Sequence, residues 1–150
     1  MGHSYSNCLI HLIFSTKGRT KTITPELQEK LWPVIGGIAR SKQMKALTVG
    51  GVDDHVHVLL SIPSSVSVST AAREIKALSS KWIHETFPDQ REFAWQQGYG
   101  AFSIGLSNIA RTVSYIEGQQ EHHHKKTFQE EFTAFLKAHG IEYDERHVWG

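Results

Sequence analysis

An α+β fold of the ferredoxin-like type, with a split βαβ order and one antiparallel sheet, is the fold class that this sequence predicts. Alternating apolar residues indicate four strands, near residues 5–15, 44–52, 55–62 and 99–104. Apolar residues at helical spacing indicate two helices between them, near residues 24–38 and 69–87. The order β-α-β-β-α-β places both helices on one face of the sheet and leaves the other face open, as in RRM-like domains.

The strand near 55–62 shows the alternation most clearly. Every second residue from Val56 to Ile62 is aliphatic, so His55 and His57 must point to the opposite face of the sheet. The strand near 5–15 alternates in the same way, with aliphatic and aromatic side chains on one face and His11 on the other. We therefore expect the aliphatic faces of both strands to lie under the helices and the histidines to lie on the open face.

Each helix has recognisable signals. Thr24 is a typical N-cap residue, and Pro25 suits the first turn, whereas Pro33 is expected to kink or shorten this helix. The inward face of the helix near 69–87 is expected to carry Ala72, Ile75, Leu78, Trp82 and Ile83.

Two further helices are expected after the last strand. One runs near residues 106–120, and the other runs near 127–139 and stops at Gly140. We expect a single domain over residues 1–150, with its core at about 5–104.

The composition excludes several classes of protein. The chain has 150 residues with 16 Lys+Arg, 15 Asp+Glu and a net charge of +1, so no global attraction to nucleic acid is expected. A lone cysteine, Cys8, excludes an intramolecular disulfide framework and a Cys-rich zinc module. No apolar run is long enough to span a bilayer, so we expect no membrane partner and a cytoplasmic location.

The His55-Val56-His57 sequence is a candidate metal site. Two imidazoles at positions i and i+2 of one strand project in the same direction and can share a divalent ion. Two ligands do not complete a site, and a polar strand face with two histidines is more often structural or solvated. Asp53 and Asp54 could contribute a ligand, or they could simply form the turn before the strand.

The helix near 106–120 carries Arg111, Tyr115 and Gln119, which are four residues apart and share one face. One interpretation is an amphipathic tyrosine at a subunit interface. In the other, Tyr115 is a nucleophile and the Gln119 amide oxygen completes a metal site. Periodicity does not choose between them.

Together these elements resemble the IS200/IS605 family of single-tyrosine HUH transposases. The resemblance covers nearly the whole chain, in short segments whose order and spacing are specific. The matching segments are residues 11–19, 53–60, 76–80, 95–103, 115–119, 128–132 and 140–143.

The resemblance implies an enzyme that cleaves and rejoins single-stranded DNA hairpins at insertion-sequence ends through a covalent 5′-phosphotyrosine. Tyr115 would be the nucleophile, and His55, His57 and Gln119 would bind a divalent ion, Mg²⁺ or Mn²⁺. No nucleotide cofactor is implied, and the sequence contains no P-loop motif. Family members form homodimers, often with the tyrosine helix donated across the dimer, and would be associated with the nucleoid when acting on DNA.

The DNA contacts that we expect are Lys17, Arg19, Lys76 and Arg111, although a solvated surface is the simpler interpretation for any single lysine. Trp95 and Tyr99 could stack on bases, with core packing the simpler interpretation for Trp95. His11 is either a partner of the two strand histidines or an ordinary polar strand residue. No catalytic role is expected for the histidine run at 122–124.

Three alternative functions remain open at the level of sequence. A domesticated relative would bind hairpin DNA without cutting it, and a metal-dependent hydrolase would use the histidines alone. A small RNA-binding domain of the same fold would need aromatic residues on the central strands, where this sequence has His55, His57 and Leu59.

Overall fold

The computed structural model describes residues 2–122 and 126–149. His123 and His124 of the histidine run lie outside the described residues. None of the helices in the described part of the chain is both long enough and apolar enough to cross a membrane.

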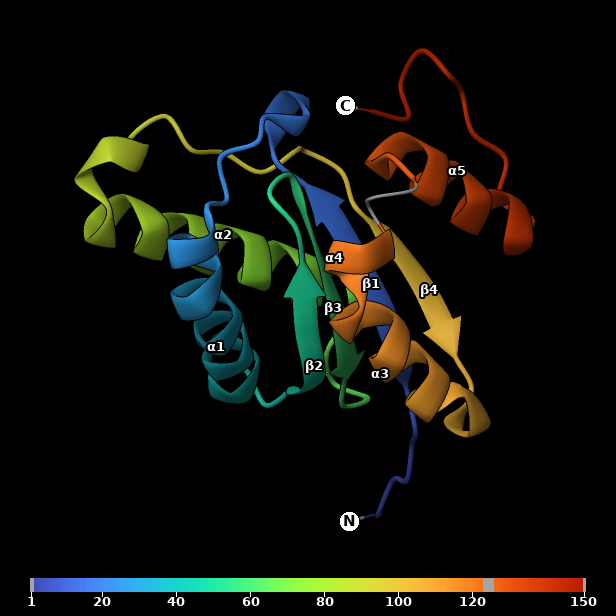
Figure 1. Cartoon of the computed structure of the whole chain (residues 1–150). Coiled ribbons are helices and arrows are strands. Elements are labelled where there is room, and N and C mark those ends of the chain that lie inside the picture. The colour runs from blue at the N-terminus through green and yellow to red at the C-terminus, as the bar shows by residue number, and fades with distance from the viewer. Residues whose placement is uncertain (1, 123–125, 150) are drawn as a thin grey trace.

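The centre of the protein is a four-stranded sheet in which all neighbouring strands are antiparallel. Its spatial order, β2-β3-β1-β4, is that of the predicted ferredoxin-like fold (Figure 1). The strands are β1 (Leu9–Ser15), β2 (Lys45–Gly51), β3 (His55–Ser61) and β4 (Gly100–Ile104). Ile13 of β1 pairs with His57 of β3, so the two central strands set the positions of the histidines.

The helices are α1 (Pro25–Ser41), α2 (Val68–Thr86), α3 (Ile109–Glu117), α4 (Gln119–His122) and α5 (Phe128–Ala138). Short 3₁₀ turns lie at η1 (Lys17–Arg19), η2 (Pro88–Gln90) and η3 (Leu106–Asn108). The Thr24 side chain caps α1 by accepting from the Leu27 N–H, as predicted. Pro33 lies inside α1, which nevertheless continues to Ser41, so the expected shortening is wrong.

The main core lies between the sheet and the α1–α2 pair. It contains the aliphatic faces of β1 and β3 that the alternation predicted, together with the apolar stripes of both helices. Trp95 belongs to this core. Its ring packs edge-on against Phe14, with 4.7 Å between the ring centres, and its indole N–H donates to Ser79 Oγ at 2.9 Å. Ser79 is buried on α2, whereas Leu78, which was expected there, is only half-buried.

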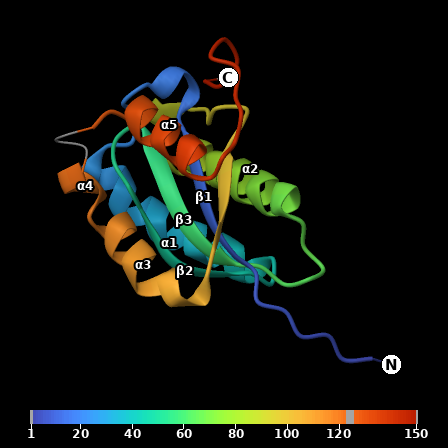
Figure 2. The same ribbon diagram turned by 90° about the vertical axis from the view of Figure 1, so that its right-hand side faces the viewer.

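The second face of the sheet is not open, and that expectation is wrong. Helix α3 packs over β2 and α5 covers the other strands, on the side of the sheet opposite α1 and α2 (Figures 1 and 2). The apolar stripe of α5 needs an apolar partner, and β1 and β4 provide one in Ile13 and Phe102. Two glycines permit this close packing. A Cβ atom at Gly50 would lie 2.5 Å from the Ile116 carbonyl oxygen, and one at Gly100 would lie 2.6 Å from the Phe132 ring, so a side chain at either position would clash.

The single helix expected near 106–120 is divided into three pieces. The turn η3 precedes α3, which ends with Gly118 as its C-cap, and α4 begins at Gln119. Arg111 and Tyr115 therefore lie on one helix, while Gln119 begins the next.

Phe132→Ala should lower the free energy of unfolding by about 3 kcal/mol, because it empties a buried aromatic position between α5 and the sheet. Urea denaturation followed by circular dichroism measures the change, with Ala134→Gly on the exposed side of the same helix as a control that costs about 1 kcal/mol. A loss for Phe132→Ala no larger than that of the control would show that α5 does not stabilise the second face.

Candidate functional site

The carboxylate of Glu131 lies at the centre of a buried polar cluster between β3, the α3–α4 segment and α5. His55 and His57 project from β3 toward α5, because strand alternation turns them away from the main core. Glu131 Oε1 lies 3.3 Å from His55 Nε2 and 3.0 Å from His57 Nε2. The ligand atoms of these three residues all lie within 4.8 Å of one another, so they could hold a metal ion.

Gln119 joins this cluster from the first residue of α4. Its Oε1 lies 3.1 Å from His55 Nε2, and its Nε2 donates to Glu131 Oε2 at 3.1 Å. The side chain is buried, with 1% of its surface exposed. The structure thus brings the predicted third ligand to the histidines, but it places a carboxylate there as well.

Tyr115 also meets Glu131. Its hydroxyl donates to Glu131 Oε2. The centre of its half-buried ring lies 5.8 Å from that of the His57 ring and 5.7 Å from that of the Phe135 ring. Burial raises the pKa of the Tyr115 phenol, and the negative charge of Glu131 raises it further. The phenol therefore keeps its proton at neutral pH and directs it to a carboxylate. We call His55, His57, Tyr115, Gln119 and Glu131 the Glu131 cluster.

Each histidine of the cluster has a second partner on its other ring nitrogen. Asp54 Oδ1 lies 2.7 Å from His55 Nδ1, and His11 Nε2 lies 2.8 Å from His57 Nδ1. Burial lowers the pKa of His55, but the hydrogen bonds to Asp54 and Glu131 outweigh it and raise the pKa to about 9. For His11, burial and the neighbouring His57 lower the pKa to about 3, so this imidazole is neutral. Of the two interpretations of His11, the 2.8 Å contact supports the one in which it is a partner of a β3 histidine, His57.

Glu131 is the member of the cluster that sequence reasoning missed. Its signal was present: Glu131 lies between Phe128 and Phe132 on the buried face of α5, and a carboxylate within an apolar helical stripe requires a polar partner. Because the face above the histidines was expected to be open, α5 was not expected to contribute to the site.

The expected DNA contacts lie in different surroundings. Lys17 and Arg111 are exposed, and the Arg19 guanidinium lies 5.5 Å from the centre of the Trp149 ring. The Lys76 ammonium instead donates to the carbonyls of Gln97 and Gly98 at 2.8 and 2.9 Å, so it holds the loop before β4. Of the two aromatic candidates for stacking, Trp95 is in the core and Tyr99 is exposed.

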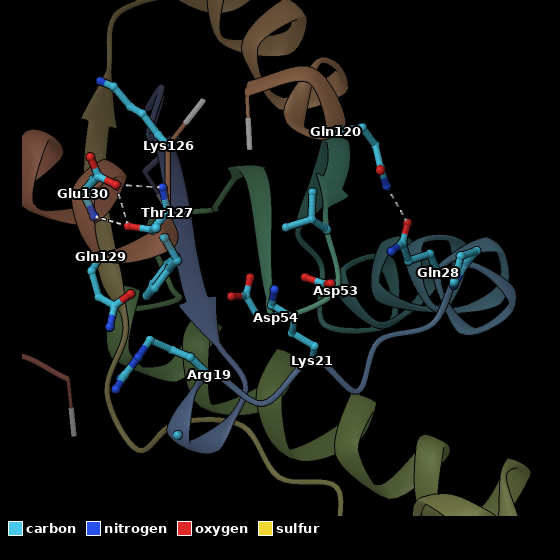
Figure 3. Close-up of a pocket in the computed structure, with 14 residues that line it drawn as sticks. Arg19, Lys21, Gln28, Asp53, Asp54, Gln120, Lys126, Thr127, Gln129 and Glu130 are labelled. Carbon is cyan, nitrogen blue, oxygen red and sulfur yellow. Dashed lines mark hydrogen bonds between the residues drawn. The ribbon is translucent and has the colours of Figure 1, made fainter. Parts of the chain in front are cut away.

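A polar cleft of about 850 Å³ opens beside the Glu131 cluster (Figure 3). Asp54 lines it, as do residues of η1, α1, α4 and the first turn of α5. Phe128 lies between the cleft and the cluster: it lines the cleft, and its ring centre lies 4.7 Å from that of the His55 ring.

The fold and the site define an α+β protein in which two imidazoles, a carboxylate and a tyrosine meet in one buried cluster. Residues 4–119 match the family model described as "Transposase IS200 like". The chain therefore belongs to the family of IS200-like transposases. The matched residues end at Gln119, so Glu131 and α5 lie beyond them.

Two relatives illustrate the family. The chain is 31% identical over 127 residues to the transposase for insertion sequence element IS200 of Salmonella typhimurium, covering 81% of this chain and 82% of that protein. It is 24% identical over 116 residues to the ISDra2 transposase TnpA of Deinococcus radiodurans, covering 74% and 83%.

Two solved structures share the fold. A Deinococcus radiodurans protein assigned as a transposase superposes with a TM-score of 0.66 at 22% identity, over 79% of this chain and 96% of that one. A REP-associated tyrosine transposase bound to a REP hairpin superposes with a TM-score of 0.60 at 17% identity, over 82% and 73%.

In metal-free protein, His11 should make the free energy of unfolding fall as the pH falls. The folded-state pKa is about 3 against 6.5 in the unfolded chain, so below pH 6.5 the unfolded chain binds a proton that the folded chain does not. Between pH 6.5 and about 5.5, the free energy of unfolding of His11→Phe should therefore fall by about 1 kcal/mol less than that of the unsubstituted protein.

Urea denaturation with a chelator present, at both pH values, measures this decline. His3→Phe, at an exposed position, is the matched control and should decline as the unsubstituted protein does. An equal decline in His11→Phe and the control would contradict the burial of a neutral His11.

Proposed function

We propose that this chain cleaves and rejoins single-stranded DNA ends that carry hairpins, through a covalent bond between Tyr115 and a 5′-phosphate. The observation that carries the proposal is the contact of the Tyr115 hydroxyl with Glu131, the same carboxylate that contacts both histidines of β3. The IS200 relative and the REP-hairpin complex of a structural neighbour support this substrate class.

The Glu131 carboxylate can serve two purposes, because its two oxygens face different partners. Oε1 faces the histidines, whereas Oε2 accepts from the Tyr115 hydroxyl and from Gln119 Nε2. The raised pKa of Tyr115 means that the phenol needs a base before it attacks. Glu131 Oε2 is in place to receive that proton, and Gln119 holds the carboxylate in this orientation.

In the cleavage step the Tyr115 oxygen attacks phosphorus, so that a bond forms between them and the bond from phosphorus to the 3′-oxygen breaks. The phenol proton passes to Glu131, and a proton returns to the leaving oxygen to give a 3′-OH. Attack of a DNA 3′-OH on the phosphotyrosine reverses these changes and releases Tyr115 with its proton restored. The exchange of one phosphate ester for another requires no nucleotide cofactor.

A divalent ion, Mg²⁺ or Mn²⁺, is part of the proposal. His55, His57 and Glu131 would hold it, with the Gln119 amide oxygen beside them. The carboxylate and amide oxygens are donors that suit Mg²⁺ and Mn²⁺. The burial of Glu131 supports this fit. A buried negative charge is costly unless it is paired, and a bound cation between the carboxylate and the two imidazoles would pair it. When bound, the ion would neutralise negative charge that develops on the scissile phosphate.

The assembly that we propose is a homodimer in which each tyrosine acts in its own chain. The contacts of Tyr115 with Glu131 and His57 lie within one chain and assemble all parts of the site, which favours action in cis over donation of the helix in trans. Light scattering measures the oligomeric state, and a strictly monomeric particle at micromolar concentration would contradict the dimer.

Tyr115→Phe should reduce formation of a covalent protein–DNA adduct by at least about 10³-fold, because it removes the attacking oxygen and keeps the ring. The assay uses a labelled single-stranded hairpin oligonucleotide with Mn²⁺, and the adduct is resolved by denaturing electrophoresis. Tyr5→Phe, at a residue that is 92% exposed, is the matched control and should retain full activity.

The same assay separates the alternative functions. A hairpin that binds tightly to the unsubstituted protein but gives no adduct would favour a domesticated DNA-binding relative. Release of a free 5′-phosphate without a protein-linked strand would favour a hydrolase. The RNA-binding alternative loses support from the fold, because α5 covers the sheet face on which bases would stack.

Coexpression of two defective chains tests whether the tyrosine acts in cis. One chain carries Tyr115→Phe and the other His57→Ala, so neither contains all parts of the site. Action in cis predicts no adduct from the mixed dimer, because Tyr115 then depends on the histidines of its own chain. An adduct on the His57→Ala chain would show donation in trans, and coexpression of two unsubstituted chains controls for activity of the dimer.

A further inference from the structure

Both histidines of the Glu131 cluster are held in the same orientation, although their surroundings differ. In each ring Nε2 faces the Glu131 carboxylate, at 3.3 Å for His55 and at 3.0 Å for His57. The other ring nitrogen, Nδ1, meets a group outside the cluster. This group is Asp54 Oδ1 at 2.7 Å for the first histidine and His11 Nε2 at 2.8 Å for the second.

These outer contacts have a defined chemical consequence for a cation site. An imidazole binds a cation only through a ring nitrogen that carries no proton. When Nε2 of His57 serves as the ligand, the remaining proton is on Nδ1, and a buried N–H needs an acceptor. His11 Nε2 lies within hydrogen-bond distance, so it accepts this proton. By the same reasoning the Asp54 carboxylate accepts the Nδ1 proton of His55.

The sheet and α5 together fix the position of His11. This residue lies diagonally across from His57, because Ile13, two residues further along β1, pairs with His57. His11 is 1% exposed, and the Phe135 ring packs edge-on against its imidazole, with 5.2 Å between the ring centres. The imidazole of His11 is therefore held beside His57 Nδ1 and has little freedom to turn away.

The backbone of Asp54 fixes its position at the turn before β3. Its carbonyl oxygen accepts from the Thr16 N–H at 2.8 Å and from the Thr16 hydroxyl at 3.3 Å. These bonds hold the turn whatever the side chain at position 54, whereas the carboxylate contacts His55. The contact with His55 is therefore additional to what the turn requires.

We propose that His11 and Asp54 are positioning residues for the cation site, each holding one β3 imidazole with its Nε2 directed at Glu131. The proposal rests on the proposed binding of a divalent ion and adds a function for two residues outside the Glu131 cluster. Neither residue would be a ligand of the ion. Acceptors of this kind fix the tautomer and the orientation of a ligand histidine, so their loss weakens metal binding although every ligand is still present.

Binding of Mn²⁺ to the full chain without DNA, followed by electron paramagnetic resonance, tests the proposal. His11→Phe fills the space but lacks an acceptor, and should raise the Kd for Mn²⁺ about 10- to 100-fold. His11→Gln offers an amide oxygen as acceptor and should recover most of the affinity. His84→Phe is the matched control, because it removes an imidazole contact with the Phe93 carbonyl on α2, across the sheet from the cluster. It should bind Mn²⁺ as the unsubstituted protein does.

Asp54 provides a second and independent pair of variants. Asp54→Ala should raise the Kd for Mn²⁺ at least about tenfold, and Asp54→Asn, which keeps an acceptor oxygen, should raise it less. In the adduct assay, His11→Phe and Asp54→Ala should need correspondingly more Mn²⁺ for half-maximal rate and should approach the unsubstituted rate when Mn²⁺ is saturating. A role in stability alone would lower the melting temperature without changing that concentration.

The outcomes separate this inference from the proposed function. An unchanged Kd in His11→Phe or Asp54→Ala, in protein that thermal melting shows to be folded, would overturn the assignment of that residue and leave the metal site intact. An equal loss of affinity in His11→Phe and His11→Gln would also overturn it, because affinity would then not depend on the acceptor. Equal Mn²⁺ binding by the unsubstituted protein and His57→Ala would overturn the proposed metal site, and the inference with it.

Discussion

The site depends on one buried carboxylate. Glu131 has 4% of its surface exposed and contacts both β3 histidines, Gln119 and Tyr115. A buried carboxylate is costly unless opposite charges or donors surround it, and here imidazoles, an amide and a phenol do so. The contact also joins segments that are far apart in sequence, because α5, the α3–α4 segment and β3 meet at this side chain.

The same contact sets the position of α5 in the second layer of the fold. The aromatic residues of α5 pack on Ile13 and Phe102, while Glu131 on the same helix face contacts the histidines. The apolar packing supplies most of the stabilisation, since each buried aromatic side chain contributes several kcal/mol, and the polar contacts set the position of the helix. Gly50 and Gly100 allow this layer to approach the sheet closely.

The electrostatics of the cluster depend on partners outside it. Asp54 and Glu131 together overcome the burial of His55 and raise its pKa, whereas His11 is buried as a neutral group against His57. In the metal-free protein His55 on β3 therefore carries a proton at neutral pH, because its pKa is about 9, whereas His11 on β1 is neutral. Asp54 also connects the cluster to the polar cleft, because it contacts His55 and lines the cleft.

The sheet, the two helices of the main core and the face on which His55 and His57 lie could all be predicted from the sequence, because alternation and helical spacing follow burial directly. The sequence also singled out Tyr115 and Gln119, which the structure brings to the histidines. That α5 closes the second face and adds Glu131 follows from the tertiary structure alone, because the periodicity of α5 indicates that one of its faces is buried but not which distant segment that face packs against. Gly118 likewise divides the expected helix so that Gln119 begins α4, a change that helical spacing alone did not indicate.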